Sequence, residues 1–334
     1  MSRFNEPVQI QFALAGPPEI PGLEVLDLFA GIGGLSLGFR ASGFSVTGVD
    51  HEEVSSEVFR TNTIGEAVQR DLLNEMEVRS VPVVVGGPPC RPWSAVNVVR
   101  RGTRHEDHAL LDRFLAHLLE IRPHVFLMEN VPALGSDPEF HRLLRELRWS
   151  GYSLAMSVLQ YSDFGAATRR RRLFTVGFRD SVRWSAEEFF ARLVERHRPK
   201  QTVRQAIEWL RDKPRGAVPD HEWSAVQTIE KYRERYRKGQ YGWRQLGWGE
   251  PAPSFGSVAK TYILHPSAGE DAFPLRVLSV REVLSIMGFD RSFRFPGGTS
   301  MTKKYRMAAN AVSPIVSEAC ARTIREMLTG ESAS

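Results

Sequence analysis

The first 180 residues alternate short apolar runs with segments of helical periodicity, and this alternation restricts the fold more than any other feature. Short runs rich in β-branched residues are typical of buried strands. Strands that alternate with helices form βαβ units, in which parallel strands are covered by helices on both faces. The sequence therefore predicts an α/β fold with a doubly wound, mostly parallel sheet. We predict strands at 25–29, 45–49, 83–85 and 125–128, helices around 35–39, through 58–59 and over about 110–121, and a hairpin-like strand pair at 153–159 and 172–178.

The alternation stops near Asp180, and the chain from there to about Phe295 is richer in tryptophan, proline and charge. This change of pattern predicts a second, smaller domain. Three further helices are predicted from apolar periodicity, at 225–238, 279–287 and 313–328. We expect the last of them to pack back on the first domain. The predicted domains are residues 1–185, 186–300 and 301–334, the last of which completes the first domain.

The composition is that of an ordinary globular protein, with 42% hydrophobic and 25% charged residues among 334. The two cysteines, Cys90 and Cys320, are far apart in the sequence. This spacing predicts neither a disulfide framework nor a cysteine-based metal site, and we expect no metal. The sequence shows no signal peptide, and no apolar stretch approaches the roughly 20 residues that span a bilayer. We therefore expect a cytoplasmic protein with no membrane partner. The formal net charge of +5 is compatible with a polyanionic partner.

A thiol follows one of the predicted strands at the edge where ligands bind in open α/β sheets. After Val83–Val85, two glycines and two prolines stop the strand, so the chain leaves it in a stiff loop that carries Cys90. The neighbouring Arg91 favours the thiolate, and a cysteine held in this way is placed like a nucleophile. The alternative is that Cys90 is a small buried hydrophobic residue, as most free cysteines are.

A second ligand-binding loop is predicted where the first strand meets the first helix. The glycines in Asp27-Leu28-Phe29-Ala30-Gly31-Ile32-Gly33-Gly34 let the backbone approach a ligand, and the helix that follows offers free N–H groups. Asp50, at the tip of the next strand, stands where an acid would bind ribose hydroxyls. The glycine spacing differs from the G-x-G-x-x-G of dinucleotide binders and suits S-adenosylmethionine, which has a ribose but no pyrophosphate. The alternative is a purely structural turn.

Six ordered blocks of the chain resemble the cytosine-5 DNA methyltransferases, and the resemblance covers nearly everything outside 180–249. Besides the glycine turn, the blocks are Gly87-Pro88-Pro89-Cys90 with Trp93-Ser94, Glu129-Asn130-Val131, Arg170 and Arg172 with Leu173-Phe174, Leu278-Ser279-Val280-Arg281-Glu282 with Met287-Gly288-Phe289, and Asn310-Ala311-Val312. The resemblance implies the S-adenosylmethionine-dependent methyltransferase variant of the doubly wound sheet, with a smaller DNA-recognition domain.

The resemblance implies S-adenosylmethionine as the cofactor and assigns residues to its pocket. Asp50 would hold the ribose, and Asp71 would face the adenine amino group. The other residues expected to bind the cofactor are Phe29, Gly31, Gly33, Gly34, Pro89, Leu110, Asn310 and Ala311.

The resemblance also implies a nucleophile, an acid and supporting arginines. Cys90 would attack carbon 6 of a cytosine flipped out of the helix, so that carbon 5 can accept a methyl group. Glu129 would give a proton to N3 as negative charge develops on the ring. Arg172 would hold both the base oxygen and Glu129, and Arg170 of the same motif is counted with the catalytic residues. The alternative for Glu129 is a carboxylate that caps a helix or forms a salt bridge.

Four positions depart from the family's pattern. Arg91 and Thr168 stand where the family usually has Gln, Ala309 stands where it has Gly, and His105-Glu106-Asp107-His108 replaces Asp-x-Arg-Gly. Arg91 changes the setting of the nucleophile, and Thr168 puts the usual contact of that Gln in doubt. None of these departures removes a catalytic atom, so activity is still predicted.

DNA contacts are expected from the nucleophile loop and from the variable region at 180–249. In this region Lys231 to Lys238 alternates basic and aromatic residues, which suit phosphates and base edges. The alternative for that segment is an amphipathic surface helix with a solvated basic face. The residues expected to contact DNA are Ser94, Arg91, Arg233, Arg235 and Arg237.

We therefore expect a monomeric DNA (cytosine-5) methyltransferase that acts on a short specific site in double-stranded DNA. The compact size of the chain favours the modification half of a bacterial restriction–modification system, at the nucleoid of a prokaryote. A transfer-RNA cytosine-5 methyltransferase would use the same chemistry, and a DNA-binding relative that has lost catalysis is another alternative. A nicotinamide dehydrogenase is disfavoured because the glycine spacing differs from that of dinucleotide binders.

Overall fold

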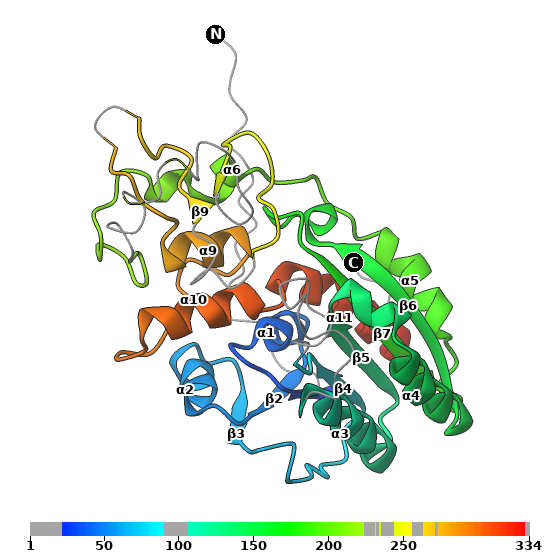
Figure 1. The fold of residues 1–334 in the computed structure, drawn as a ribbon. Coiled ribbons are helices and arrows are strands. Elements are labelled where there is room, and N and C mark those ends of the chain that lie inside the picture. The colour runs from blue at the N-terminus through cyan, green and yellow to red at the C-terminus, as the bar shows by residue number, and fades with distance from the viewer. Residues whose placement is uncertain are drawn as a thin grey trace.

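The central feature of the molecule is a seven-stranded sheet. The computed structural model describes residues 22–89, 106–223, 231, 234, 244–255, 263–270 and 273–330. The strands of this sheet are β1 (Glu24–Leu28), β2 (Ser45–Asp50), β3 (Glu66–Gln69), β4 (Val83–Gly86), β5 (Val125–Asn130), β6 (Tyr152–Gln160) and β7 (Arg171–Arg179), in the spatial order β3-β2-β1-β4-β5-β7-β6. Strands β1 to β5 are parallel, β7 is antiparallel to β5, and β6 is antiparallel to β7. The predicted doubly wound, mostly parallel sheet is confirmed (Figure 1).

The strands predicted from apolar runs are all present, with ends shifted by one or two residues. β1 ends at Leu28 because Phe29 has a φ of 63°, which is not a strand conformation. The predicted hairpin-like pair is formed by β6 and β7, with Leu159 opposite Arg172. The short strand β3 was not predicted, because its four residues at the sheet edge include two polar ones and offer no apolar run.

Helices lie on both faces of the sheet, and successive residues of a strand point to opposite faces. Val83 and Val85 of β4 pack in the core that includes residues of helices α1 and α11, whereas Val84 between them packs with residues of α3 and α4. The helices are α1 (Gly34–Ala41), α2 (Glu53–Thr61), α3 (Glu106–Ile121), α4 (Pro138–Trp149), α5 (Ala186–Val194), α6 (Val203–Ile207), α9 (Val280–Ile286), α10 (Met301–Asn310) and α11 (Pro314–Thr329), with short 3-10 helices at η3 (Pro132–Ser136), η4 (Tyr161–Phe164) and η5 (Glu208–Leu210).

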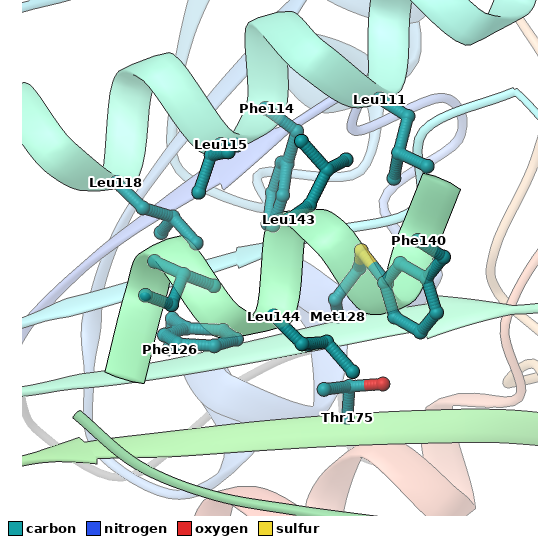
Figure 2. A pocket seen from close by; sticks show the side chains of 11 residues that line it. Leu111, Phe114, Leu115, Leu118, Phe126, Met128, Phe140, Leu143, Leu144 and Thr175 are labelled. Atoms are coloured by element: carbon teal, nitrogen blue, oxygen red, sulfur yellow. The ribbon is translucent and has the colours of Figure 1, made fainter. Parts of the chain in front are cut away.

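The layer between α3, α4 and the sheet is almost wholly apolar. Figure 2 shows side chains of both helices pointing toward Phe126 and Met128 of β5. They leave a cavity of about 20 Å³, which Thr175 of β7 also lines. This packing holds one face of β5, the strand that carries Glu129.

Several helices lie outside the predicted elements, although some of them carry clear start signals. In α4, Asp137 accepts hydrogen bonds from the backbone N–H groups of Glu139 and Phe140, and Pro138 occupies the first turn. In α10, the side chain of Ser300 accepts from the N–H of Lys303. Both signals can be read from the sequence, and α4 also has a buried apolar stripe at helical spacing, formed by Phe140, Leu143, Leu144 and Leu147, which the sequence analysis did not use.

A region of short elements, residues 196–300, follows the sheet and is called the small region here. It contains α6, α9 and the two-residue strands β8 (Arg244–Gln245) and β9 (Ile263–Leu264). Figure 1 shows α6, β9 and α9 gathered at one end of the molecule, next to α10. The predicted helix at 279–287 is confirmed as α9. Most of the predicted helix at 225–238 lies outside the described residues, and only Lys231 and Glu234 of it are described, both as helical.

The C-terminal prediction is also confirmed, because α11 spans Pro314–Thr329 and packs against α1. The predicted domain boundaries at 185/186 and 300/301 stay predictions. Helix α5, which would open the second domain, packs against β6 and α11. Within the described residues, none of the helices has the length and apolar character that crossing a membrane requires.

Candidate active site

The register of the sheet brings the predicted site residues to one edge. Leu28 of β1 lies opposite Val49 of β2 and Gly86 of β4, and Gly86 lies opposite Met128 of β5. The residues that follow are Asp50, Phe29, Gly87 and Glu129. Because β7 runs antiparallel to β5, its first residues also lie at this edge, and Arg172 is among them. The chain turns away in different directions after β1 and β4, which is where doubly wound sheets bind ligands.

The glycine turn after β1 has a strained backbone that glycine accommodates. Phe29, Gly31 and Gly33 all have positive φ, of 63°, 55° and 77°, and Gly33 caps α1. A Cβ on Gly34 would lie 2.2 Å from the carbonyl oxygen of Val312, so only glycine lets the start of α1 approach the segment before α11. The glycine turn, near the start of the sheet, therefore packs directly against the segment before the last helix, α11.

Asp50 braces this turn with both carboxylate oxygens. Its Oδ2 accepts from the N–H of Gly31 at 2.9 Å, and its Oδ1 accepts from the N–H of Glu52 at 2.9 Å. Glu52 in turn pairs with Arg306 of α10 through both oxygens, at 2.7 and 2.8 Å. Burial raises the pKa of Glu52, but the hydrogen bonds and charges of Arg306 and Lys303 outweigh it and leave that pKa below its usual value. The tip of β2 is therefore fixed against α10.

The other residues predicted to bind the cofactor are spread around this edge. Asp71 is exposed, and its Oδ2 accepts from the side chain of Asn74 at 2.7 Å. Asn310 is exposed at the C-terminal end of α10, and Ala311, half-buried, caps that helix. Pro89 is half-buried after β4, and Leu110 is half-buried in the first half of α3.

Asp27, one residue before the end of β1, is a buried acid that the sequence analysis did not single out. It is 1% exposed, and the hydroxyl of Ser36 donates to its Oδ2 at 2.6 Å. Within the described chain, its Oδ1 has no hydrogen-bond partner. Burial, together with the nearby charge of Asp50, raises the pKa of Asp27 to about 7 despite the hydrogen bond from Ser36. An acid directly before the glycine turn thus titrates near neutral pH.

Glu129 is held at the end of β5 by an ion pair and a hydrogen bond. Its side chain is 9% exposed, and its Oε1 lies 3.1 Å from Nε of Arg172. The hydroxyl of Tyr161 donates to the same Oε1 at 3.2 Å. A Cβ built on Gly87 would lie 3.5 Å from Oε2, so the second oxygen faces the loop that leads to Cys90. The amide of Asn130 donates to the carbonyl of Pro88 at 3.1 Å and ties this loop to β5.

Arg170 and Arg172 belong to one motif but lie in different surroundings. The guanidinium of Arg172 contacts Glu129, as described above. That of Arg170 is buried and donates to the carbonyl oxygens of Ala309 at 2.8 Å and Asn310 at 3.2 Å. Burial and the neighbouring charge of Arg172 lower the pKa of Arg170. Arg170 therefore joins the arginine motif to the end of α10.

Thr168 and its neighbours join the arginine motif to the small region. Thr168 is fully buried, and its hydroxyl donates to the carbonyl of Pro253 at 3.3 Å. The N–H of Arg169 donates to the carbonyl of Ala252 at 2.7 Å, and the N–H of Ala252 donates to that of Ala167 at 2.8 Å. The hydroxyl of Thr168 is thus hydrogen-bonded to the backbone of the small region.

The nucleophile loop and the basic segment lie outside the described residues. This applies to Cys90, Arg91, Ser94, Arg233, Arg235 and Arg237. The other cysteine, Cys320, is fully buried in α11, and burial raises the pKa of its thiol far above the usual value. Cys320 is therefore no nucleophile. Among the described residues, no group of three or more His, Cys, Asp and Glu side chains is placed to hold a metal ion.

The comparison with solved structures defines the class of fold. The structure superposes on S. pombe Dnmt2 methyltransferase with a TM-score of 0.71 at 17% identity, covering 92% of this chain and 99% of that one. It also superposes on the Entamoeba histolytica methyltransferase EhMeth with a TM-score of 0.66 at 16% identity, covering 93% and 99% of the two chains. The fold is that of a methyltransferase.

The chain itself belongs to the C-5 cytosine-specific DNA methylases, whose family model matches residues 23–326, and is a DNA (cytosine-5) methyltransferase. It is 29% identical to the Type II methyltransferase M.FnuDI of Fusobacterium nucleatum over 92% of this chain and 95% of that protein. It is also 29% identical to the Type II methyltransferase M.MthTI of Methanothermobacter thermautotrophicus, over 92% and 98% of the two chains. The resemblance found in the sequence is confirmed.

Proposed function

We propose that the protein transfers the methyl group of S-adenosylmethionine to carbon 5 of a cytosine flipped out of a short specific site in double-stranded DNA, through a covalent bond between Cys90 and carbon 6. One observation carries the proposal: the buried pair of Glu129 and Arg172 lies at the same sheet edge as the glycine turn. Gly87, whose loop leads to Cys90, adjoins the carboxylate. An acid, a cofactor turn and a nucleophile loop thus converge where α/β sheets bind ligands.

The residues near the glycine turn fit a cofactor with a ribose and a positive charge. A Cβ on Gly31 would meet nothing within 4 Å, so the backbone there is open to a ligand. Asp50 and Asp71 lie at or just after the ends of two strands of this edge, and such acids suit a sulfonium and an ammonium group but would repel a pyrophosphate. When bound, S-adenosylmethionine supplies an electrophilic methyl group. The residues proposed to hold it are Phe29, Gly31, Gly33, Gly34, Asp50, Asp71, Pro89, Leu110, Asn310 and Ala311.

The chain's own residues make carbon 5 reactive. The sulfur of Cys90 forms a bond to carbon 6, and the ring gains an electron pair. Glu129 gives a proton to N3 and thereby neutralises the charge that develops. Arg172 holds Glu129 through Oε1 and donates to the base oxygen. Carbon 5 uses this electron pair to bond to the methyl group. Its own proton then passes to water, the double bond between carbons 5 and 6 re-forms as the sulfur of Cys90 leaves as a thiolate, and N3 returns its proton to Glu129.

The DNA would lie between the sheet edge and the small region. Arg91 and Ser94 would contact it from the nucleophile loop, and Arg233, Arg235 and Arg237 from the basic segment. The similarity to Type II methyltransferases supports a role in protecting host DNA from a partner restriction endonuclease. We also propose that the chain acts as a monomer in the cytoplasm.

Bisulfite sequencing of plasmid DNA from cells that express the chain tests the proposal and reveals the site. The wild type should protect one cytosine of a short recurring sequence, and Cys90→Ser should abolish the modification. Cys320→Ser is the matched control and should keep it, because Cys320 is buried in α11.

Purified protein should also form a covalent adduct with a duplex that carries 5-fluorocytosine in the site, in the presence of S-adenosylmethionine. Radiolabelled cofactor offered with DNA or transfer RNA separates the DNA enzyme from one that acts on RNA. Absence of an adduct at Cys90, or label that enters only the RNA, would contradict the proposal.

A further inference from the structure

Tyr161 is a buried polar residue next to the proposed acid that no motif singled out. It begins η4, directly after β6, and its side chain is fully buried. Burial, together with the nearby charge of Glu129, raises the pKa of its hydroxyl far above the usual value, so the hydroxyl keeps its proton. A buried tyrosine hydroxyl needs a hydrogen-bond partner, and here that partner is Oε1 of Glu129 at 3.2 Å.

The two oxygens of Glu129 have different surroundings. Oε1 accepts a hydrogen bond from the hydroxyl of Tyr161 at 3.2 Å and forms an ion pair with Nε of Arg172 at 3.1 Å. For Oε2, the described part of the chain supplies no hydrogen bond, and this oxygen faces the loop at Gly87. The carboxyl group is therefore anchored through one oxygen, and the other is directed toward the nucleophile loop.

Tyr161 is also held in place by Arg170. The guanidinium of Arg170 lies 5.9 Å from the centre of the Tyr161 ring, and the N–H of Tyr161 donates to the carbonyl of Arg170 at 2.9 Å. Arg170 in turn donates to the carbonyls of Ala309 and Asn310 at the end of α10. One chain of contacts thus runs from the end of α10, through Arg170 and Tyr161, to Glu129.

We propose that Tyr161 is a positioning residue that holds Oε1 of Glu129 and so makes Oε2 the oxygen that gives the proton to N3 of the cytosine. This inference rests on the proposed function, in which Glu129 is the proton donor. When the proton has left, the hydroxyl of Tyr161 donates to a carboxylate, and a hydrogen bond to an ionised group is about twice as strong as a neutral one. Tyr161 thereby also stabilises the carboxylate that the transfer produces.

Tyr161→Phe removes the hydroxyl and keeps the ring under Arg170. We expect the rate of methyl transfer in a single turnover to fall about tenfold, because the carboxyl group is no longer fixed in one orientation. The KM for DNA should change by less than about twofold, because Tyr161 is buried beneath Glu129. The pH profile of the rate should also change, because the lost hydroxyl contacts the group that gives the proton.

Tyr152→Phe is the matched control, because Tyr152 is also buried, begins β6, the strand that leads to Tyr161, and donates its hydroxyl to the carbonyl of Pro123 at 2.8 Å. It loses one buried hydrogen bond away from Glu129 and should keep the wild-type rate and pH profile. Equal effects of the two substitutions on the rate and its pH profile would overturn the proposal.

Fluorotyrosine at position 161 offers a second measurement if Tyr161→Phe unfolds. Fluorine makes the hydroxyl a stronger donor at nearly constant size, so the pH profile of the rate should differ from that of the wild type; an unchanged profile would contradict the proposal. Formation of the adduct with 5-fluorocytosine tests the proposed function and the role of Tyr161 separately. No adduct with the wild type means that the proposed function fails, whereas adducts that form equally fast with wild type and Tyr161→Phe refute only the role of Tyr161.

Discussion

The sheet and the small region bury different kinds of side chain. The interior of the sheet is mostly apolar, with Asp27 of β1 as an exception, and Val83, Val84 and Val85 of β4 are all fully buried. The small region instead buries charged groups, and Arg276, Arg281 and Glu282 are each at most 2% exposed. A sheet satisfies its own backbone groups through its ladders, whereas an irregular chain needs side chains to do so. In the small region, buried charged side chains therefore supply hydrogen bonds to the backbone that strands and helices supply elsewhere.

Arg281 of α9 illustrates this role. Its guanidinium donates to the carbonyl oxygens of Pro219 at 3.0 Å, Asp290 at 3.1 Å and Phe293, and it lies 3.4 Å from Asp220. One side chain thus holds three loop carbonyls that no strand or helix satisfies. Burial lowers the pKa of Arg281, while the charges of Asp220 and Asp290 act in the opposite direction.

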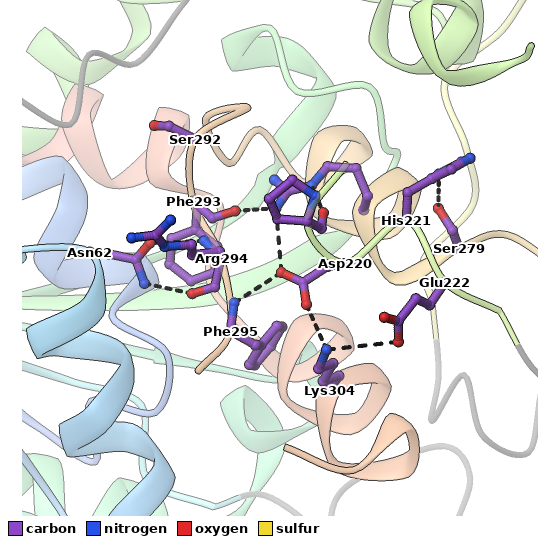
Figure 3. Close-up of polar contacts among 12 residues, drawn as sticks. Asn62, Asp220, His221, Glu222, Ser279, Ser292, Phe293, Arg294, Phe295 and Lys304 are labelled. Atoms are coloured by element: carbon purple, nitrogen blue, oxygen red, sulfur yellow. Dashed lines mark hydrogen bonds and ion pairs between the residues drawn. The ribbon is translucent and has the colours of Figure 1, made fainter. Parts of the chain in front are cut away.

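Asp220 extends this network to the rest of the molecule. Figure 3 shows its carboxylate between Lys304 of α10 at 2.8 Å and the backbone N–H of Phe295 at 2.9 Å. In the same view, Asn62 after α2 forms two hydrogen bonds with the backbone of Arg294, each of 2.8 Å. These polar contacts link the small region to α10 and to the end of α2.

The largest effect is expected from Arg281→Met, which removes the centre of this network. Three carbonyls lose their donor and Asp220 loses a partner, so the free energy of unfolding should fall by about 3–5 kcal/mol. Urea unfolding measures this change. A loss below about 1 kcal/mol would show that the small region does not depend on buried charge, and the contrast with the sheet would then disappear.

Asp27→Asn in β1 is expected to raise the free energy of unfolding above neutral pH, whereas Arg281→Met lowers it. The folded-state pKa of about 7 lies above the reference value of 3.8, so the folded chain holds the proton more tightly than the unfolded chain. The free energy of unfolding of the wild type should therefore fall as the pH rises from about 4 to 7, by an amount on the order of a few kcal/mol. Asparagine does not ionise and can still accept from Ser36.

The variant Asp27→Asn should consequently be more stable than the wild type at pH 8 and about equally stable at pH 4, when unfolding is measured without cofactor. Equal pH dependence of the two proteins would contradict the interpretation of Asp27 as a buried, neutral acid. The two substitutions test the comparison together. Removal of the charge of Arg281 should destabilise the small region, whereas removal of the charge of Asp27 should stabilise the sheet.

The smallest effect is expected from Arg142→Ala on the outer surface of α4. Arg142 contacts Asp112, Glu139 and Glu146, but its side chain is 40% exposed. Exposed ion pairs contribute below about 1 kcal/mol, and salt weakens them further. Unfolding in low and high salt measures this contribution. A loss as large as that of Arg281→Met would show that the number of ion pairs, and not their burial, decides stability.

The sequence predicted the sheet because its signals are local. The apolar runs of β1, β2, β4 and β5 and the glycine turn need no distant partner to be recognised. The position of Glu129 after an apolar strand likewise placed it at the correct edge of the sheet. Glu129 contacts Arg172 because β7 runs antiparallel to β5. The predicted hairpin-like pair already included β7 as one of its two strands.

The remaining features depend on partners far apart in the chain. Tyr161 lies 32 residues from Glu129, and nothing near Tyr161 marks it as part of the site. The same holds for Arg281 and Asp220, which are 61 residues apart. Two arginines at neighbouring positions of one motif, Arg170 and Arg172, differ in surroundings only because α10 packs against the first of them. Side-chain partners of this kind cannot be read from periodicity or spacing.

The backbone hydrogen bonds between 167–169 and Ala252 have a consequence for hybrid enzymes. They make the stretch around Ala252 a structural partner of the segment that leads into β7, although it belongs to the small region. A donor segment transplanted to test the proposed DNA-recognition region would carry its own version of that partner if it extended past Glu250. A junction placed before Glu250 would exchange the proposed recognition segment and leave the backbone contacts of 167–169 native.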